Sequence, residues 1–263
     1  MSAAALAISG LSKSFAGVRA IRDLSFTVPK GVTTALIGPN GAGKTTVFNL
    51  VSGVYGVDAG RIEVNGQDVT HMPSRKRIST GVARSFQNIR LMPHLTVIEN
   101  VMLGQHVQAT GLADLLAPIA WQRHGKWRRM AEERLLQAGI DVDPDSPVSG
   151  LPYGVRKKIE VVRALMSGPR LLMLDEPAAG LNPRETTELS SFLKGIAADG
   201  LTLLVVEHDM SFVHDLCEQT VVLNFGRLIY DGPTRGVQDD EAVREAYLGT
   251  RRVDTGQGAG RAA

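Results

Sequence analysis

A glycine-rich stretch between an apolar run and an amphipathic run sets the strongest limit on how this chain folds. It follows the pattern Gly, four residues, Gly-Lys-Thr, and its members are Gly38, Pro39, Asn40, Gly41, Ala42, Gly43, Lys44, Thr45 and Thr46. Residues 32–37 before it are apolar and β-branched enough for a buried strand. After it, apolar residues recur at the spacing of one helix face, at Val47, Leu50, Val51 and Val54. Strand, loop and helix together predict an α/β fold around a phosphate-binding loop.

The residue types of this loop suit a polyphosphate. The glycines let backbone N–H groups curl around an anion at a helix N-terminus, where the helix dipole favours negative charge. Lys44 is expected to reach the β- and γ-phosphates, and Thr45 to hold Mg²⁺ through its hydroxyl. The alternative is a glycine-rich turn with a surface lysine, which the flanking strand and helix disfavour. The sequence therefore predicts a nucleotide-binding protein.

Length, charge and cysteine content narrow the class of protein. The 263 residues suffice for one large α/β domain, or for a core with a subdomain. A net charge of +2 is too small to argue for nucleic acid. The single cysteine, Cys217, excludes an internal disulfide and fits a reducing cytosol. No apolar run approaches the roughly 20 residues that span a bilayer, and the start lacks the pattern of a secretory signal. If this protein acts at a membrane, we therefore expect it to do so through partner proteins.

Strand-like runs occur in two groups. Residues 6–14, 21–28 and 61–69 read as antiparallel β-structure, with a hairpin turn at Asn65-Gly66. The later runs are continuously apolar, as in a parallel sheet covered on both faces, and they are residues 171–174, 201–206 and 220–223. The residues from Phe225 to Asp231 read as a closing hairpin. The chain is therefore predicted to combine an antiparallel β part with a parallel α/β core.

A helical block separates the two groups of strands. Thr96 stands three residues before Glu99, which predicts a capping box that opens a helix over 97–106. A second helix is predicted over 131–138, ended by Gly139. No strand signal occurs between these helices, so the block reads as an all-helical insertion into the α/β core.

Two acids end a hydrophobic run in the predicted parallel sheet. Asp175 and Glu176 directly follow Leu-Leu-Met-Leu at 171–174. Ligands of open α/β sheets bind at such strand ends, so these carboxylates are expected beside the phosphates. Asp175 would help to hold Mg²⁺, and Glu176 would polarise an attacking water as general base. Two solvated carboxylates are the alternative, which the neighbouring phosphate loop disfavours.

Two further residues are candidates for contact with the γ-phosphate. His208 follows the apolar run 203–206, so a neighbouring strand end would bring its imidazole to the phosphate or the water. A lone histidine is more often structural, and the position after a core strand favours the functional role. Gln87 lies where the core gives way to the helical block, and its amide could touch the metal or the water. Without the other motifs it would be an ordinary surface glutamine.

In this order, the motifs resemble the nucleotide-binding subunit of an ABC transporter. The resemblance rests on the phosphate loop, Gln87, the run 171–177 and His208, and it covers about residues 6–248. It implies a P-loop NTPase fold: a RecA-like core with an N-terminal antiparallel β subdomain and an inserted all-helical subdomain.

The same resemblance implies the domain limits. The nucleotide-binding domain would span residues 1–250, with the helical subdomain at about 90–168. Residues 251–263 are rich in Gly, Arg and Ala without an apolar pattern, and they are expected to form a disordered tail.

The family also predicts a Leu-Ser-Gly-Gly-Gln signature at the head of a helix before the acidic strand. At that place the chain has Leu151, Pro152, Tyr153, Gly154 and Val155. Pro152 carries neither a hydroxyl nor an N–H group, and Val155 lacks the side-chain amide, so donors to the ATP of the opposite subunit are missing. Basic residues at 156–158 oppose the helix dipole and suggest an anion nearby, with partner contact or solvation as the alternative.

Other positions gain roles from the resemblance. Phe15 matches the aromatic residue that stacks on adenine, and a core phenylalanine is the alternative. The D-loop of the family corresponds to Gly180, Leu181 and Asn182. Asn182 replaces the usual aspartate there. It also stands as a helix N-cap before a proline, and the two roles are compatible.

Longer matches narrow the resemblance to ATPases that drive branched-chain amino-acid uptake. They lie at residues 83–87, 95–101, 175–185 and 246–249. Tyr153 at the third signature position is typical of that subfamily. The long helical block looks more like its larger, LivG-type ATPase than like the shorter LivF type.

The implied function is ATP hydrolysis, with Mg²⁺, that energises import of branched-chain or related amino acids. Two ATPase subunits would pack head to tail, as a heterodimer, against two transmembrane permeases at the cytoplasmic face of the plasma membrane. A solute-binding protein would deliver the solute, and no nucleic acid would be bound.

Three other functions share some of these motifs. A related importer for urea, an amide or another amino acid fits the same motifs. A non-transport ABC ATPase acting on nucleic acid usually has tandem ATPase domains, coiled coils or zinc cysteines, which this chain lacks. A regulator that binds ATP without hydrolysis conflicts with the presence of Glu176 and His208.

A basic stretch in the helical block has an open role. It comprises Arg123, His124, Lys126, Arg128 and Arg129, interleaved with Trp121 and Trp127. A solvated loop is one interpretation, and contact with the permease or with lipid headgroups is the other.

Overall fold

The antiparallel part of the chain forms a four-stranded sheet. The computed structural model describes residues 4–85, 89–107 and 125–248. The strand order in this sheet is β2-β1-β4-β5, and the strands are β1 (Ala4–Phe15), β2 (Val18–Pro29), β4 (Ala59–Val64) and β5 (Gln67–Asp68). Asn65 and Gly66 join the last two with φ angles of 51° and 82°. These angles suit a two-residue hairpin turn, so the predicted hairpin is confirmed.

The second sheet has six strands and carries the core of the fold. Its order is β10-β9-β3-β8-β7-β6, and the strands are β3 (Thr33–Ile37), β6 (Val82–Arg84), β7 (Leu171–Asp175), β8 (Thr202–Val206), β9 (Gln219–Asn224) and β10 (Arg227–Pro233). All neighbours are parallel except β9 and β10, which form the closing hairpin. Every residue of β3, β7 and β8 is buried, as the apolar runs predict.

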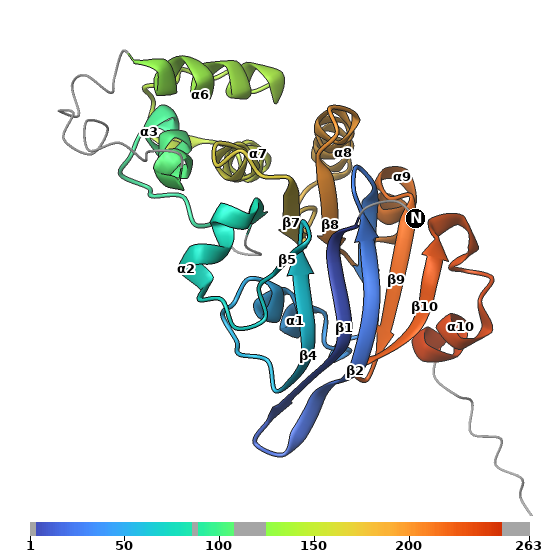
Figure 1. The fold of residues 1–263 in the computed structure, drawn as a ribbon. Helices are drawn as coiled ribbons and strands as arrows, with labels where there is room; N and C mark the ends of the chain where they lie inside the picture. Colours follow the sequence, from blue (N-terminus) through green and yellow to red (C-terminus); the bar gives the residue numbers. More distant parts are fainter. Residues whose placement is uncertain (1–3, 86–88, 108–124, 249–263) are drawn as a thin grey trace, which may run out of the picture.

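Helices cover the six-stranded sheet and extend to one side of it. They are α1 (Lys44–Val51), α2 (Ser74–Arg77), α3 (Val97–Met102), α6 (Lys126–Gln137), α7 (Tyr153–Leu165), α8 (Pro183–Ala198), α9 (Met210–Leu216) and α10 (Glu241–Leu248). Short 3-10 turns span Ile78–Thr80, Leu103–Val107, Val148–Gly150 and Thr234–Gly236. Figure 1 shows α3, α6 and α7 together at the upper left, away from α1 and the antiparallel sheet.

Successive residues of the central strands alternate between two hydrophobic clusters. In β7, Leu171 and Met173 belong to the cluster that includes α1 and the antiparallel sheet. Leu172 and Leu174 belong to the cluster that includes α7, α8 and α9. The parallel sheet is therefore buried between two layers, which confirms the α/β class with its antiparallel β part.

Several local predictions are corrected by the structure. Helix α1 ends at Val51, and Val54 is 57 % exposed rather than part of the buried face. The cause is Gly53, which has a φ of 74° and lies against the Arg77 side chain. The helix predicted over 97–106 changes to a 3-10 turn after Met102. The strand β6 was not predicted at all.

The helical block begins its long helix earlier than predicted. Helix α6 starts at Lys126, so it takes in Trp127 and two arginines of the basic stretch. Arg128 in that stretch pairs with Glu132 at 2.7 Å and with Asp145 at 2.8 Å. These contacts give part of the basic stretch a structural role. Trp121, Arg123 and His124 lie outside the described residues.

Within the ranges that the structure describes, no helix combines the length and apolarity needed to cross a membrane.

Candidate active site

Three adjacent parallel strands bring the predicted site residues to one edge of the sheet. β8 lies between β3 and β7, and Val206 is paired with Asp175 at the carboxyl ends of their strands. The phosphate loop follows β3, Glu176 follows β7, and His208 comes two residues after β8. The strand order therefore gathers residues that lie more than 100 positions apart in the sequence.

The phosphate loop has a backbone that only glycine adopts easily at its two ends. Gly38 and Gly43 have φ angles of 149° and 104°. A side chain at Gly38 would collide with the carbonyl oxygen of Leu223, and one at Gly43 would lie 2.7 Å from Ile21 Cδ1. Helix α1 begins directly after Gly43. The loop therefore presents a helix N-terminus inside a tight glycine turn, the arrangement that binds phosphate groups.

Lys44 folds back onto the loop that precedes it. Its Nζ donates to the carbonyl of Gly38 at 2.6 Å and to that of Pro39 at 3.1 Å. Burial lowers the pKa of this ammonium, and the negative charges of Glu176 and Asp175 oppose that shift. The cation therefore lies inside the loop and faces the two acids.

Asp175 is held by an arginine that sequence reasoning gave no role. Arg84 Nη2 donates to Asp175 Oδ2 at 2.8 Å, with both side chains less than a tenth exposed. The other nitrogen, Nη1, donates to Asn49 Oδ1 at 2.7 Å, and the guanidinium lies over the Phe48 ring. Arg84 thus ties the acid at the end of β7 to helix α1.

Glu176 and His208 meet in the structure. Glu176 Oε1 lies 2.7 Å from His208 Nε2, and their side chains are 20 % and 45 % exposed. Glu176 has a φ of 48°, and its backbone N–H donates to the carbonyl of Val206 at 2.9 Å. The strained backbone turns the carboxylate toward the loop after β8. The two residues predicted to act together on an attacking water are therefore in direct contact.

The residues proposed for Mg²⁺ fit a small, hard cation. Among the described residues, no group of three or more His, Cys, Asp or Glu side chains forms a metal cluster. Mg²⁺ is commonly held by only one or two carboxylates, with phosphates and water filling the remaining positions. Thr45 is an exposed residue in the first turn of α1, and Asp175 is the last residue of β7. Gln87, the third predicted ligand, lies outside the described residues.

Phe15 lies at the surface in an aromatic pair. It is 38 % exposed, which excludes the alternative of a core phenylalanine. Its ring meets that of Tyr55 edge-on, with centroids 5.0 Å apart, and Lys13 Nζ lies 5.4 Å from the Phe15 centroid. Tyr55 was missed because no motif points to it. The pair offers an exposed aromatic face beside β1, suitable for stacking on a base.

The altered signature heads helix α7, as its position predicts. Pro152 is the N-cap residue and makes no side-chain cap hydrogen bond. Tyr153 is 37 % exposed, and Arg156 and Lys157 lie over its ring at 5.7 and 5.9 Å. Lys158 pairs with Glu188 at 3.0 Å. Contacts within the chain therefore account for the basic residues at the head of the helix, and no external anion is needed to explain them.

One carboxylate connects the signature to the predicted D-loop. Asn182 caps α8 in a capping box with Glu185, which confirms the N-cap prediction. A Cβ added at Gly154 would lie 2.6 Å from Glu185 Oε1, so a larger residue there would have to displace this carboxylate. Tyr153 similarly lies beside Gly180, whose Cβ would be 3.2 Å from its ring. The heads of α7 and α8 are thus packed directly together.

The comparison with known families decides the class of this protein. Residues 21–179 match the family described as ABC transporter. The chain belongs to the ABC transporter family. Its phosphate loop and its two acids lie inside the matched range, and it is accordingly a nucleotide-binding ATPase.

Similar ABC proteins match this chain over nearly its whole length. It is 36 % identical over 253 residues to the high-affinity branched-chain amino acid transport ATP-binding protein BraF of Pseudomonas aeruginosa, covering 95 % of this chain and 99 % of the relative. It is 37 % identical, with the same coverage, to LivG of Salmonella typhimurium, which has the same description. A nucleotide-free ATP-binding cassette of an ABC transporter superposes with a TM-score of 0.80 at 27 % identity, covering 94 % of this chain and 99 % of that one.

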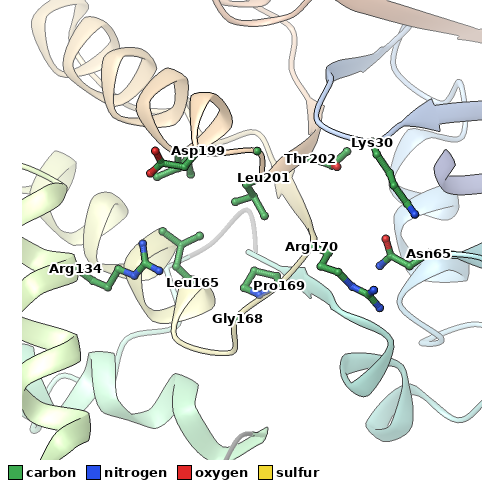
Figure 2. Close-up of a pocket in the computed structure, with 12 residues that line it drawn as sticks. Lys30, Asn65, Arg134, Leu165, Gly168, Pro169, Arg170, Asp199, Leu201 and Thr202 are labelled. Atoms are coloured by element: carbon green, nitrogen blue, oxygen red, sulfur yellow. The ribbon is translucent and has the colours of Figure 1, made fainter. Parts of the chain in front are cut away.

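A cavity at the opposite edge of the sheet is separate from this ABC site. It has a volume of about 350 Å³ and lies near the starts of β7 and β8, lined by Lys30, Asn65, Arg134, Arg170, Asp199 and Thr202 among others. Figure 2 shows Arg134 and Leu165 on one side of it and Lys30 and Asn65 on the other. It contains none of the predicted site residues.

Proposed function

We propose that this chain is the ATP-hydrolysing subunit of an importer for branched-chain amino acids, attached to the cytoplasmic face of the plasma membrane. The observation that carries the proposal is the 36–37 % identity to two branched-chain amino acid transport ATP-binding proteins over 95 % of the chain. The contact of Glu176 with His208 supports hydrolysis rather than binding alone.

Each residue at the sheet edge has a role in this proposal. Lys44 and the glycine loop bind the β- and γ-phosphates of ATP. Glu176 takes a proton from the attacking water, and His208 donates a hydrogen bond to the water or the γ-phosphate. Mg²⁺, held by Thr45, Asp175 and Gln87, would neutralise charge that develops on the phosphates. Phe15 stacks on the adenine.

The other half of each ATP site comes from a second subunit. In the proposed head-to-tail heterodimer, Leu151 to Val155 face the ATP that is held by the partner's phosphate loop. The D-loop at 180–182 lies beside this signature, so both reach the same interface. Two permeases and an external solute-binding protein complete the assembly. The proposed domain spans residues 1–250, with its helical subdomain at about 90–168, and the tail at 251–263 lies outside the described residues.

The proposal is tested by identifying the partners and then the solute. Permeases that copurify with the tagged chain are reconstituted with it and with the solute-binding protein. Leucine, isoleucine or valine is expected to stimulate ATP hydrolysis severalfold. Stimulation by urea, an amide or another amino acid alone would assign a different importer. Copurification with nucleic acid in place of permeases would contradict transport altogether.

A further inference from the structure

A buried carboxylate next to His208 has no part in the chemistry proposed above. Glu207 is the first residue after β8 and is only 4 % exposed. Charged side chains are rarely buried to this extent unless polar groups surround them. What holds Glu207 in place therefore indicates what it does.

Backbone N–H groups from two different loops donate to this carboxylate. Ala178 N donates to Oε1 at 2.7 Å, and His208 N donates to Oε2 at 3.0 Å. Ala178 lies two residues after Glu176, in the loop that follows β7. One side chain thus joins the loop that carries the proposed base to the loop that carries the histidine.

The charge of Glu207 is balanced within the same region. Burial raises the pKa of its carboxyl group, and the nearby charge of Glu176 adds to the rise, whereas hydrogen bonds from the backbone N–H groups of Ala178, His208 and Asp209 lower it. Lys157, buried on α7, faces this group of acids: burial lowers the pKa of its ammonium, and Glu160, Glu207, Glu176 and Asp175 oppose that shift. Lys157 Nζ also lies 3.5 Å from the carbonyl oxygen of Glu176.

We propose that Glu207 is a positioning residue for ATP hydrolysis. Its two oxygens hold the loops after β7 and β8 at the separation at which Glu176 and His208 make their 2.7 Å contact. The inference rests on the proposed function, because it assigns Glu207 a role through those two residues. Glu207 itself touches neither water nor nucleotide in this role.

Glu207→Gln tests the role with little change of shape. Glutamine keeps one oxygen acceptor, but its NH₂ group faces a backbone N–H, so one of the two loops is released. In the complete assembly we expect kcat to fall at least fivefold, while KM for ATP stays within threefold of wild type. A smaller fall in kcat overturns the proposal. A loss of nucleotide binding also overturns it, because the residue would then be structural only.

The variant Glu207→Asp distinguishes the effect of side-chain length from the effect of charge. Aspartate retains the charge that faces Lys157 but is one methylene shorter, so it cannot span both N–H groups. A fall in kcat of at least fivefold is expected again, and full activity would show that charge alone suffices. Glu218→Gln is the matched control, since Glu218 is exposed near the start of β9, and its kcat should not change.

The last measurement combines Glu207→Gln with His208→Ala. If Glu207 acts through the pair, the loss in the double variant is smaller than the product of the two single losses. Losses that multiply would show an independent effect and reject positioning. Failure of the proposed function is distinguishable, because His208→Ala and Glu176→Gln would then leave turnover unchanged on their own.

Discussion

The phosphate end and the signature end of this ATPase differ in how far the chain itself completes them. At the phosphate end, Lys44 bonds the loop, Asp175 is paired with Arg84, and Glu176 meets His208. At the signature end, Pro152 caps α7 without any side-chain hydrogen bond, and Tyr153 is more than a third exposed. The functional residues of the phosphate end contact one another, whereas the signature end presents the first turn of helix α7.

This difference follows from where polar groups find partners. Buried polar groups must be satisfied inside the chain, so the residues at the sheet edge hold one another in place. The first N–H groups of a helix have no partner within that helix, and the side chain of Pro152 supplies no acceptor for those of α7. The residues of the phosphate end therefore contact one another within the chain, whereas in the proposed dimer the signature end would act on the ATP of a second subunit.

The largest effect is expected from a substitution that disrupts the phosphate end alone. Glu176→Gln removes the proposed base but keeps the shape, so ATPase activity in the assembled complex should fall about 10²–10⁴-fold. Binding of ATP should remain nearly intact. Steady-state hydrolysis and nucleotide affinity are measured together, with Glu133→Gln on the exposed side of α6 as control. Activity within threefold of wild type would remove Glu176 as the base.

The next prediction compares hydrolysis at the two ATP sites of the proposed dimer, one closed by the signature of this chain and the other by the signature of the partner. In the proposed dimer, the site closed by Pro152 to Val155 lacks one or two charge-assisted hydrogen bonds, each worth about 1.5–3 kcal/mol, and should be slower by at least about tenfold. Glu176→Gln should therefore remove most activity of the complex, and the equivalent change in the partner should remove little. Equal losses of ATPase activity would show that the altered signature is tolerated, or that the two sites hydrolyse ATP only together.

Restoring the signature sharpens the same comparison. Pro152→Ser with Val155→Gln returns a hydroxyl, an N–H group and a side-chain amide to the head of α7. In a complex that also carries Glu176→Gln, residual hydrolysis at the partner's site should rise about tenfold, the value of one recovered hydrogen bond. An unchanged residual rate would mean that these donors do not limit the slow site.

A separate effect is expected on nucleotide affinity at the phosphate end. Lys44→Ala removes the buried cation of the loop, so the affinity for ATP should fall about 10- to 150-fold. Lys30→Ala, an exposed lysine at the opposite edge of the sheet, serves as the control. Equilibrium binding of a fluorescent ATP analogue gives both values, and equal affinities would argue against a phosphate contact.

The smallest effect concerns the adenine. Phe15→Ala removes one exposed ring of the aromatic pair, and stacking worth about 0.5–1.5 kcal/mol predicts a two- to tenfold loss of ATP affinity. Affinity for inorganic triphosphate should stay unchanged, because it has no base. Leu136, 79 % exposed on α6, provides the control variant Leu136→Ala. A parallel loss of triphosphate binding would place the effect outside the base contact.

The parts of the fold that could be predicted are those that are determined by residues close together in the sequence. The phosphate loop, the capping box at Thr96, the N-cap at Asn182 and the Asn65-Gly66 turn each depend on neighbouring residues only. The meeting of Glu176 with His208 followed from the rule that parallel strands end at one edge.

The parts that could not be predicted depend on contacts between distant residues. β6 is only three residues long and contains Arg84, so it carries no strand pattern of its own. The partner of that arginine, Asp175, lies 91 positions away. Glu207 likewise accepts a hydrogen bond from Ala178, which lies 29 positions earlier on another loop. No periodicity or motif encodes such pairs, and only the assembled sheet reveals them.

The packing of Gly154 against Glu185 also limits how this sequence can change over time. Any larger residue at 154 would meet the Glu185 carboxylate, which at the same time closes the capping box of α8. A side chain at 154 would therefore displace this carboxylate and weaken the start of α8. Among descendants of this protein, substitutions at 154 are expected to occur together with changes at 185.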